Sequence, residues 1–127
     1  SELRTIKGGP GGGSSSGYGY LPVAEFTSSV LDTGSATTQY YTIDPGVSLQ
    51  TNATIKFQVR SSDVATMTGS SWMGPDGTAV SYFTSQEAAV LPSLLNNKRF
   101  LQYKVFFTSE DGIHTSTLND IEFTYQK

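Results

Sequence analysis

Alternation of apolar and polar side chains with a period of two is the feature that most constrains what this chain can fold into. Residues 54–60 and residues 121–125 each place three apolar side chains on one side and polar or charged ones on the other. Because neighbouring side chains of a β-strand point to opposite faces, each segment is predicted to form a half-buried strand. The residues expected to face inward are Ile55, Phe57, Val59, Ile121, Phe123 and Tyr125.

A longer strand is predicted over residues 99–107, where apolar side chains occur on both faces. This pattern is typical of a central strand that is partly covered on each side. It directs Phe100 and Phe106 away from the face that carries Tyr103. Weaker strands are predicted over residues 24–30, 39–43 and 80–84.

Strong turn sequences separate these strands, and regular short strands between turns indicate an all-β sandwich or barrel. One segment, residues 85–96, has helical potential, but Pro92 interrupts it, so we expect a helical turn or an irregular crossing loop there. The 127 residues suit a single domain. The predicted turns are Asp32-Thr33-Gly34, Asp44-Pro45-Gly46, Gly74-Pro75-Asp76-Gly77 and Glu110-Asp111-Gly112.

The N-terminal segment differs from the rest in composition. Residues 8–19 consist of Gly, Ser, Pro and one Tyr, which predicts a flexible linker. Residues 1–7 are predicted to be a disordered terminus or, alternatively, the last turn of an upstream helix. We therefore expect an N-terminal tether over residues 1–19 and a β domain over residues 20–127. Because the chain starts with Ser1 rather than Met, we also expect it to derive from a longer precursor.

Composition narrows the classes of partner. Charged residues make up 15% of the chain, below the ~25% of a typical soluble domain, and hydroxyl-rich, weakly charged chains are often extracellular. The net charge is −3 and the basic residues are scattered, so no nucleic-acid partner is expected. The chain has no cysteine, and it lacks an apolar run of the ~18 residues that a membrane-spanning helix needs.

Five segments in order carry a family resemblance: FTSSVLDTG at 26–34, IKFQVR at 55–60, WMGPDGT at 72–78, RFLQYKV at 99–105 and LNDIEFTY at 118–125. Together they resemble a β-sandwich module of bacterial and archaeal cell-surface proteins and of prepilin-like proteins, similar to the galactose-binding-like (discoidin-type) jelly rolls. The resemblance spans about residues 24–125. It implies an antiparallel, jelly-roll-like β-sandwich at the cell surface or outside the cell, without implying a defined activity.

No catalytic residues are predicted. The only histidine, His114, lies beside Asp111 in a turn-like stretch, and a Ser-His-Asp hydrolase is the alternative that we disfavour. Most of the carboxylates occur in turns, where Asp side chains bond to their own backbone. We therefore predict no metal site and no cofactor, with a structural calcium ion in a loop as an alternative.

Aromatic residues are the better candidates for binding. Trp72 and Tyr82 flank the turn that contains Asp76, and the three form a predicted ligand-binding group at one loop edge. Sugar-binding jelly rolls use exposed rings, since a flat apolar face matches the C–H face of a pyranose. A single tryptophan in a β-sandwich is more often a core residue, so we expect Trp72 to be buried. One of Tyr40 and Tyr41 must face outward, because they are neighbours in one strand.

Glycosylation is a further expectation. Asn52 begins an Asn-Ala-Thr acceptor pattern, and Ser14, Ser15 and Ser16 are candidates for O-linked sugars.

Two functions follow from these observations. The first is a non-catalytic structural module, the globular head of a cell-surface or pilus-like filament subunit, whose partners are other protein subunits. Such a head should carry aromatic residues such as Phe100 and Phe106 on its outer faces. The alternative is a carbohydrate-binding or adhesion module of a larger secreted protein, whose partners are glycans.

Overall fold

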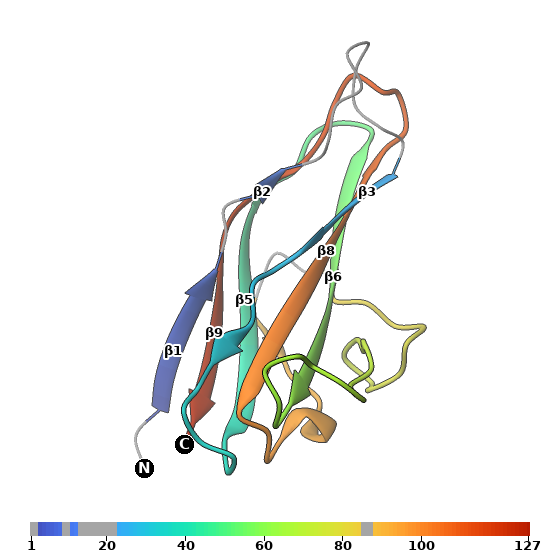
Figure 1. The fold of residues 1–127 in the computed structure, drawn as a ribbon. Coiled ribbons are helices and arrows are strands. Elements are labelled where there is room, and N and C mark those ends of the chain that lie inside the picture. The colour runs from blue at the N-terminus through green and yellow to red at the C-terminus, as the bar shows by residue number, and fades with distance from the viewer. Residues whose placement is uncertain (1–2, 9–10, 13–22, 85–87) are drawn as a thin grey trace.

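The computed structural model describes residues 3–8, 11–12, 23–84 and 88–127. Two antiparallel sheets pack against each other, which confirms the predicted all-β sandwich (Figure 1). β1 and β2 lie in the first sheet and β3 and β4 in the second, and from β4 to β9 successive strands alternate between the two sheets. Among the described residues, no helix is long and apolar enough to cross a membrane.

The first sheet has β9 near its centre. One edge of β9 pairs with β1 and then with β2, and its other edge pairs with β5, which in turn pairs with β7. These strands are β1 (Leu3–Gly8), β2 (Gly11–Gly12), β5 (Gln39–Ser48), β7 (Ala89–Val90) and β9 (Thr117–Gln126).

The second sheet has β8 at its centre. One edge of β8 pairs with β6 over ten residues, and its other edge pairs with β3 and, further along, with β4. Beyond β6, Met73 and Phe83 form single bridges to Val59 and Phe57. The strands are β3 (Val23–Thr27), β4 (Leu31–Asp32), β6 (Ala53–Ser62) and β8 (Phe100–Ser109).

The core lies between the two sheets and is made by the side chains that the alternation predicted to face inward. Ile55, Phe57 and Val59 of β6 pack with Ile121, Phe123 and Tyr125 of β9 in one cluster of buried residues. β8 contributes Leu101, Tyr103, Val105 and Phe107 to the same cluster. Phe100 and Phe106, on the opposite face of β8, are only half-buried, as its two-sided pattern predicted.

The N-terminal segment corrects one prediction. Leu3–Gly8 is neither a helical turn nor a tether, but an edge strand in register with β9. Ile6 packs against the core, and Gly8 lies so close to Tyr103 that a Cβ there would be 2.5 Å from the phenol oxygen. Glycine is therefore needed for a tight approach and not for flexibility. Residues 13–19, and with them the predicted domain boundary, lie outside the described residues.

The predicted turn at Asp44-Pro45-Gly46 is also wrong, because β5 runs through it. Proline has no N–H to donate to a strand on its second side, and β7 pairs only with Thr42 and Ile43 of β5.

A register shift next to Tyr40 lets its neighbour Tyr41 face outward, with 38% of its surface exposed, while Tyr40 is buried. This confirms the prediction that only one of the two points inward.

Two weaker predictions are realised only in part. Within residues 88–96, Ala89–Val90 form β7, and the predicted helical potential is limited to the 3-10 turn η1 (Ser93–Leu95), which begins directly after Pro92; residues 85–87 lie outside the described residues. The strand predicted over residues 80–84 reduces to the bridge at Phe83.

Candidate binding face

A loop that we call the flap, residues 72–84, covers the outer side of β6. It is attached to the edge of that strand at both ends, through the backbone pairs Met73–Val59 and Phe83–Phe57. Between these points the buried Gln58 donates its amide hydrogens to the carbonyl oxygens of Ala79 and Ser81, each at 2.9 Å. A polar residue of β6 thus fixes the flap over the sheet.

Asp76 organises the flap from within. Its Oδ1 accepts hydrogen bonds from the backbone N–H and the hydroxyl of Thr78 and from the hydroxyl of Ser81. These bonds, that of Ser81 first, lower the pKa of Asp76. Gly77 has φ 82°, and a Cβ at Gly74 would collide with the backbone of Ser81. Both glycines of the GPDG sequence are therefore required by the turn.

The flap places Trp72 and Tyr82 on the outer face of the β6–β8 sheet. The guanidinium of Arg60 lies 4.3 Å from the centre of the Trp72 ring, and the ammonium of Lys104 lies 4.8 Å from it. Tyr82 meets Phe106 edge-on, with 5.4 Å between the ring centres. The ammonium of Lys56 lies 3.9 Å above the Tyr82 ring. We call this surface the aromatic–basic face; its residues are Lys56, Arg60, Trp72, Tyr82, Lys104 and Phe106.

The prediction that Trp72 is a core residue is wrong. It is half-buried and lies outside the core cluster, because the flap begins at the edge of β6 and turns its first ring over the outer surface. Trp72 and Tyr82 therefore lie on one face, with Phe106 against Tyr82. Asp76 does not join them through any described contact, since its hydrogen bonds remain inside the flap.

Sequence reasoning missed the three cations of this face. Lys56 and Arg60 occupy outward positions of the most regular alternation in the chain, and Lys104 has the same position in β8. The pattern placed these side chains outside. It could not show that rings from a loop 12 or more residues away would cover them, because the course of that loop is set by tertiary contacts.

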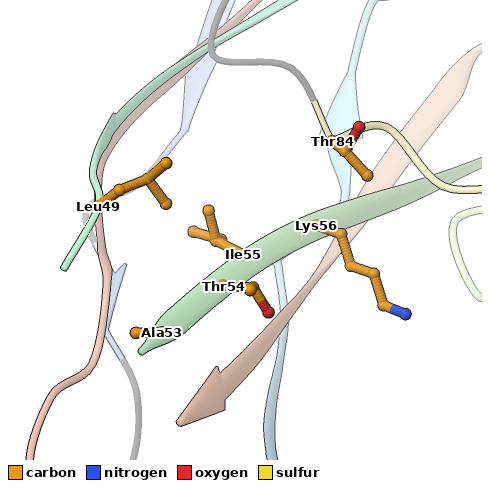
Figure 2. Close-up of a pocket in the computed structure, with 6 residues that line it drawn as sticks. All are labelled: Leu49, Ala53, Thr54, Ile55, Lys56 and Thr84. Carbon is orange, nitrogen blue, oxygen red and sulfur yellow. The ribbon is translucent and has the colours of Figure 1, made fainter. Parts of the chain in front are cut away.

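A pocket of about 380 Å³ lies beside this face, at the start of β6. Figure 2 shows Leu49 and Ile55 directed toward each other, while the ammonium of Lys56 points away from them. The side chain of Lys56 thus lines the pocket and also reaches Tyr82. The complete lining is Leu49, Ala53, Thr54, Ile55, Lys56 and Thr84.

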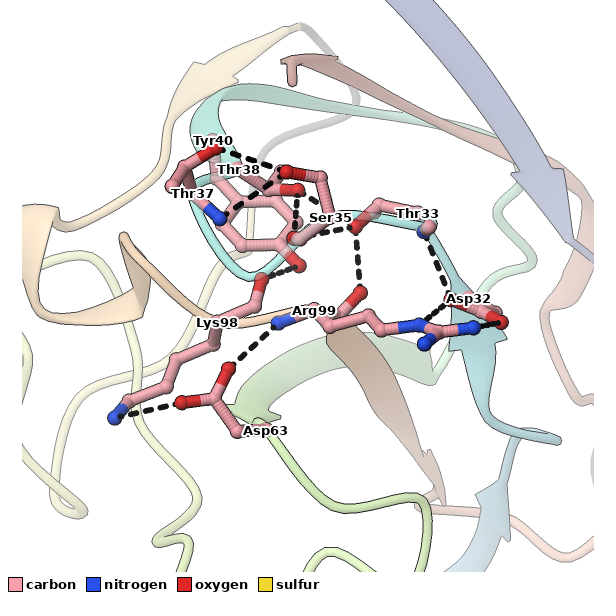
Figure 3. Close-up of polar contacts among 10 residues, drawn as sticks. Asp32, Thr33, Ser35, Thr37, Thr38, Tyr40, Asp63, Lys98 and Arg99 are labelled. Carbon is pink, nitrogen blue, oxygen red and sulfur yellow. Dashed lines mark hydrogen bonds and ion pairs between the residues drawn. The ribbon is translucent and has the colours of Figure 1, made fainter.

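A cluster of polar residues lies where β4, the start of β5 and the start of β8 meet (Figure 3). Arg99 binds Asp32 through two hydrogen bonds of 2.7 and 2.8 Å, and this pairing lowers the pKa of Asp32 from 3.8 to about 2. The buried hydroxyl of Thr33 donates or accepts a bond to Thr38 and also reaches the Arg99 carbonyl. The hydroxyl of Tyr40 donates to the Lys98 carbonyl. These bonds join β4, β5 and the start of β8, so this cluster is structural.

His114 lies in the turn between β8 and β9. Its Nδ1 is 2.7 Å from Oδ2 of Asp111, and this contact is the main cause that lowers the pKa of Asp111. Asp111 also accepts the backbone N–H groups of Ile113 and His114, as a turn residue does. The nearest serine contact, from Ser109, goes to Asp111 and not to the imidazole.

The remaining candidates are placed as follows. Asn52 is exposed in the connection between β5 and β6 with φ 59°, and its amide donates to Asp111. A turn role explains this residue, since asparagine tolerates left-handed backbone. Ser14, Ser15 and Ser16 lie outside the described residues. In the described part of the chain, no group of three His, Asp or Glu side chains gathers as metal ligands would.

No protein-family model matches the chain, and no curated protein matches it either. The resemblance to galactose-binding-like modules thus stays a prediction from five sequence segments.

Proposed function

We propose that the chain is a non-catalytic β-sandwich module that acts outside the cell and binds carbohydrate through the aromatic–basic face. The observation that carries this proposal is the gathering of Trp72, Tyr82 and Phe106 on one outer sheet face. Partly exposed rings are costly to keep in water, and they offer the flat apolar surface that the C–H groups of a sugar ring require.

Two further features support it. The flap is held by Gln58 and by two backbone bridges, so the rings are positioned before any ligand arrives. Asp111 and His114, the residues that acid–base chemistry would need first, are engaged within one surface turn.

A glycan array probed with the purified chain tests the proposal. The wild type is expected to bind a defined set of glycans, and Tyr82→Ala is expected to bind them at least tenfold more weakly. Tyr41→Ala is the matched control, because Tyr41 is an exposed tyrosine on the other sheet. Absence of binding across the array, or equal losses in both variants, would contradict the proposal.

A second candidate is a subunit of a surface assembly, whose partner is another copy or a neighbouring subunit. The exposed apolar side chains of Val80, Val90 and Leu94 favour it. The flap and η1 are close together, since a Cβ at Gly77 would lie 2.7 Å from Leu94. Concentration-dependent sedimentation that is abolished in Val80→Asp/Leu94→Asp would support this function. A monomer at all concentrations, together with native filaments that lack the chain, would refute it.

A further inference from the structure

The charge of the aromatic–basic face is opposite to that of the whole chain. The chain carries a net charge of −3, yet this face holds three cations, Lys56, Arg60 and Lys104. The carboxylate described next to them belongs to Glu25 on β3, 3.8 Å from the ammonium of Lys104 and half exposed. The Lys104 side chain is 20% exposed, but the pair is long and water reaches its carboxylate, so the attraction between the two charges is weak. The face is therefore electrostatically suited to an anion.

The cations retain unused donors. Arg60 donates from Nε to Gln102, and its two Nη groups make no hydrogen bond with the described residues. A lysine ammonium has three donors, and its position over a ring uses none of them as a conventional hydrogen bond. Lys56 and Lys104 thus lie over the rings of Tyr82 and Trp72 with donors available.

The position of these cations also discriminates between ligands. A neutral sugar that stacks on Trp72 or Tyr82 contacts the ring but forms no ion pair with the cation beside it. An acidic sugar makes the same ring contact, and its anionic group can also pair with that cation. The arrangement thus favours charged glycans over neutral ones.

We infer that the aromatic–basic face selects acidic glycans, whose rings contact Tyr82 and Trp72 while a carboxylate or sulfate ester pairs with Arg60 and Lys104. This inference rests on the proposed function and deepens it by naming the class of glycan. The shared chemistry is an anionic group on a pyranose ring.

Binding of matched oligosaccharides tests the inference, with the fluorescence of Trp72, the only tryptophan of the chain, as the readout. The probes are tetragalacturonic acid, its methyl ester, a sulfated galactose tetrasaccharide and the desulfated form. At least one acidic probe is expected to bind more tightly than its neutral partner. Its affinity is expected to fall as sodium chloride rises, because salt screens exposed charges.

Substitutions test which cations bind the anionic group of the probe. Arg60→Gln and Lys104→Gln are each expected to weaken binding of the acidic probe by up to about fivefold, the effect of one exposed ion pair. Arg60→Lys is expected to retain most of the binding. Lys7→Gln is the control, because Lys7 lies on the other sheet beside Glu122. Thermal melting of every variant separates loss of binding from loss of fold.

The outcomes are distinguishable. Equal affinity for acidic and neutral partners overturns the inference and leaves the proposed function standing. Binding of tetraglutamate as tightly as tetragalacturonic acid overturns the sugar specificity, since a peptide lacks the pyranose ring. Binding to none of the probes, together with an empty glycan array, overturns both the inference and the proposed function.

Discussion

The two sheets share one core but present different outer surfaces. Outside the first sheet, threonines of β1, β9 and β5 lie in register, and Asp44 stands directly opposite Glu122. Outside the second sheet, Lys56 stands opposite Phe106, and the flap adds two further rings. Packing requires similar apolar residues on the two inner faces, so only the outer positions are free to differ. The outer faces, which differ between the two sheets, are thus the places where a function can reside.

If the sheets differ only on the outside, equivalent core truncations should cost the same. Phe57 of β6 and Phe123 of β9 are both fully buried in the common cluster. Phe57→Ala and Phe123→Ala are each expected to lower the free energy of unfolding by about 3–5 kcal/mol, from lost burial and the cavity left behind. Denaturation in urea measures both. If only one variant were strongly destabilised, the core would not be shared equally.

Removal of an outward polar side chain should destabilise the protein when the residue is in β6 and have little effect when it is in β9. Gln58→Ala leaves the carbonyl oxygens of Ala79 and Ser81 without their donor, so we expect a loss of about 1–3 kcal/mol. Trp72 should also become more accessible to acrylamide as the flap loosens. Thr124→Ala, at an outward position of β9, is the control and should stay within about 0.5 kcal/mol. Unchanged quenching in Gln58→Ala would show that the flap is held by other contacts.

Acid should act through the ion pair at the end of the second sheet. The hydrogen bond from Arg99 lowers the pKa of Asp32 from 3.8 to about 2, so folding favours the charged carboxylate. Its contribution to stability is complete above pH 4 and is lost as the pH falls toward 2. Asp32→Asn and Arg99→Gln should both flatten the dependence of the melting temperature on pH across that range.

A residual slope is expected in both variants, because the pKa of Asp76 and that of Asp111 are also lowered. An unaltered slope in Asp32→Asn would show that the pair with Arg99 adds no acid sensitivity.

Much of the fold could be predicted from the sequence, because burial on one face dictates the alternation in β6, β8 and β9. The predictions that are wrong share a physical cause. The sequence predicts a turn at Pro45 and a flexible linker from Gly8, but each residue lies in a strand at a place where its special backbone is tolerated or needed. Proline occurs where β5 has no second ladder, and Gly8 lies against the ring of Tyr103. Those circumstances depend on neighbours distant in sequence.

The candidate site could be predicted only in part. The spacing of Trp72 and Tyr82 around a tight turn indicated a loop with two rings near one edge. Their position over the sheet depends on Gln58, a residue that local pattern describes only as an outward polar side chain of a strand. The cations of the face were missed for the same reason.

Removal of one charge should have opposite effects on the two outer faces, and this is the smallest of the expected changes. Asp44 faces Glu122 across β5 and β9, and like charges in that position repel each other. Asp44→Asn is therefore expected to raise the free energy of unfolding by about 0.2–1 kcal/mol. Lys56→Gln removes the cation over Tyr82 and is expected to lower it by about 0.5–1 kcal/mol.

Urea denaturation at low and high salt measures both substitutions. Salt should shrink the gain in Asp44→Asn, because the repulsion acts between exposed charges, whereas the contact of Lys56 with Tyr82 should be less affected since part of it is packing. Shifts of the same sign in the two variants would mean that the outer faces do not differ in electrostatic character. The selectivity for acidic glycans would then lose its basis in charge, while the aromatic rings would remain to bind a neutral sugar.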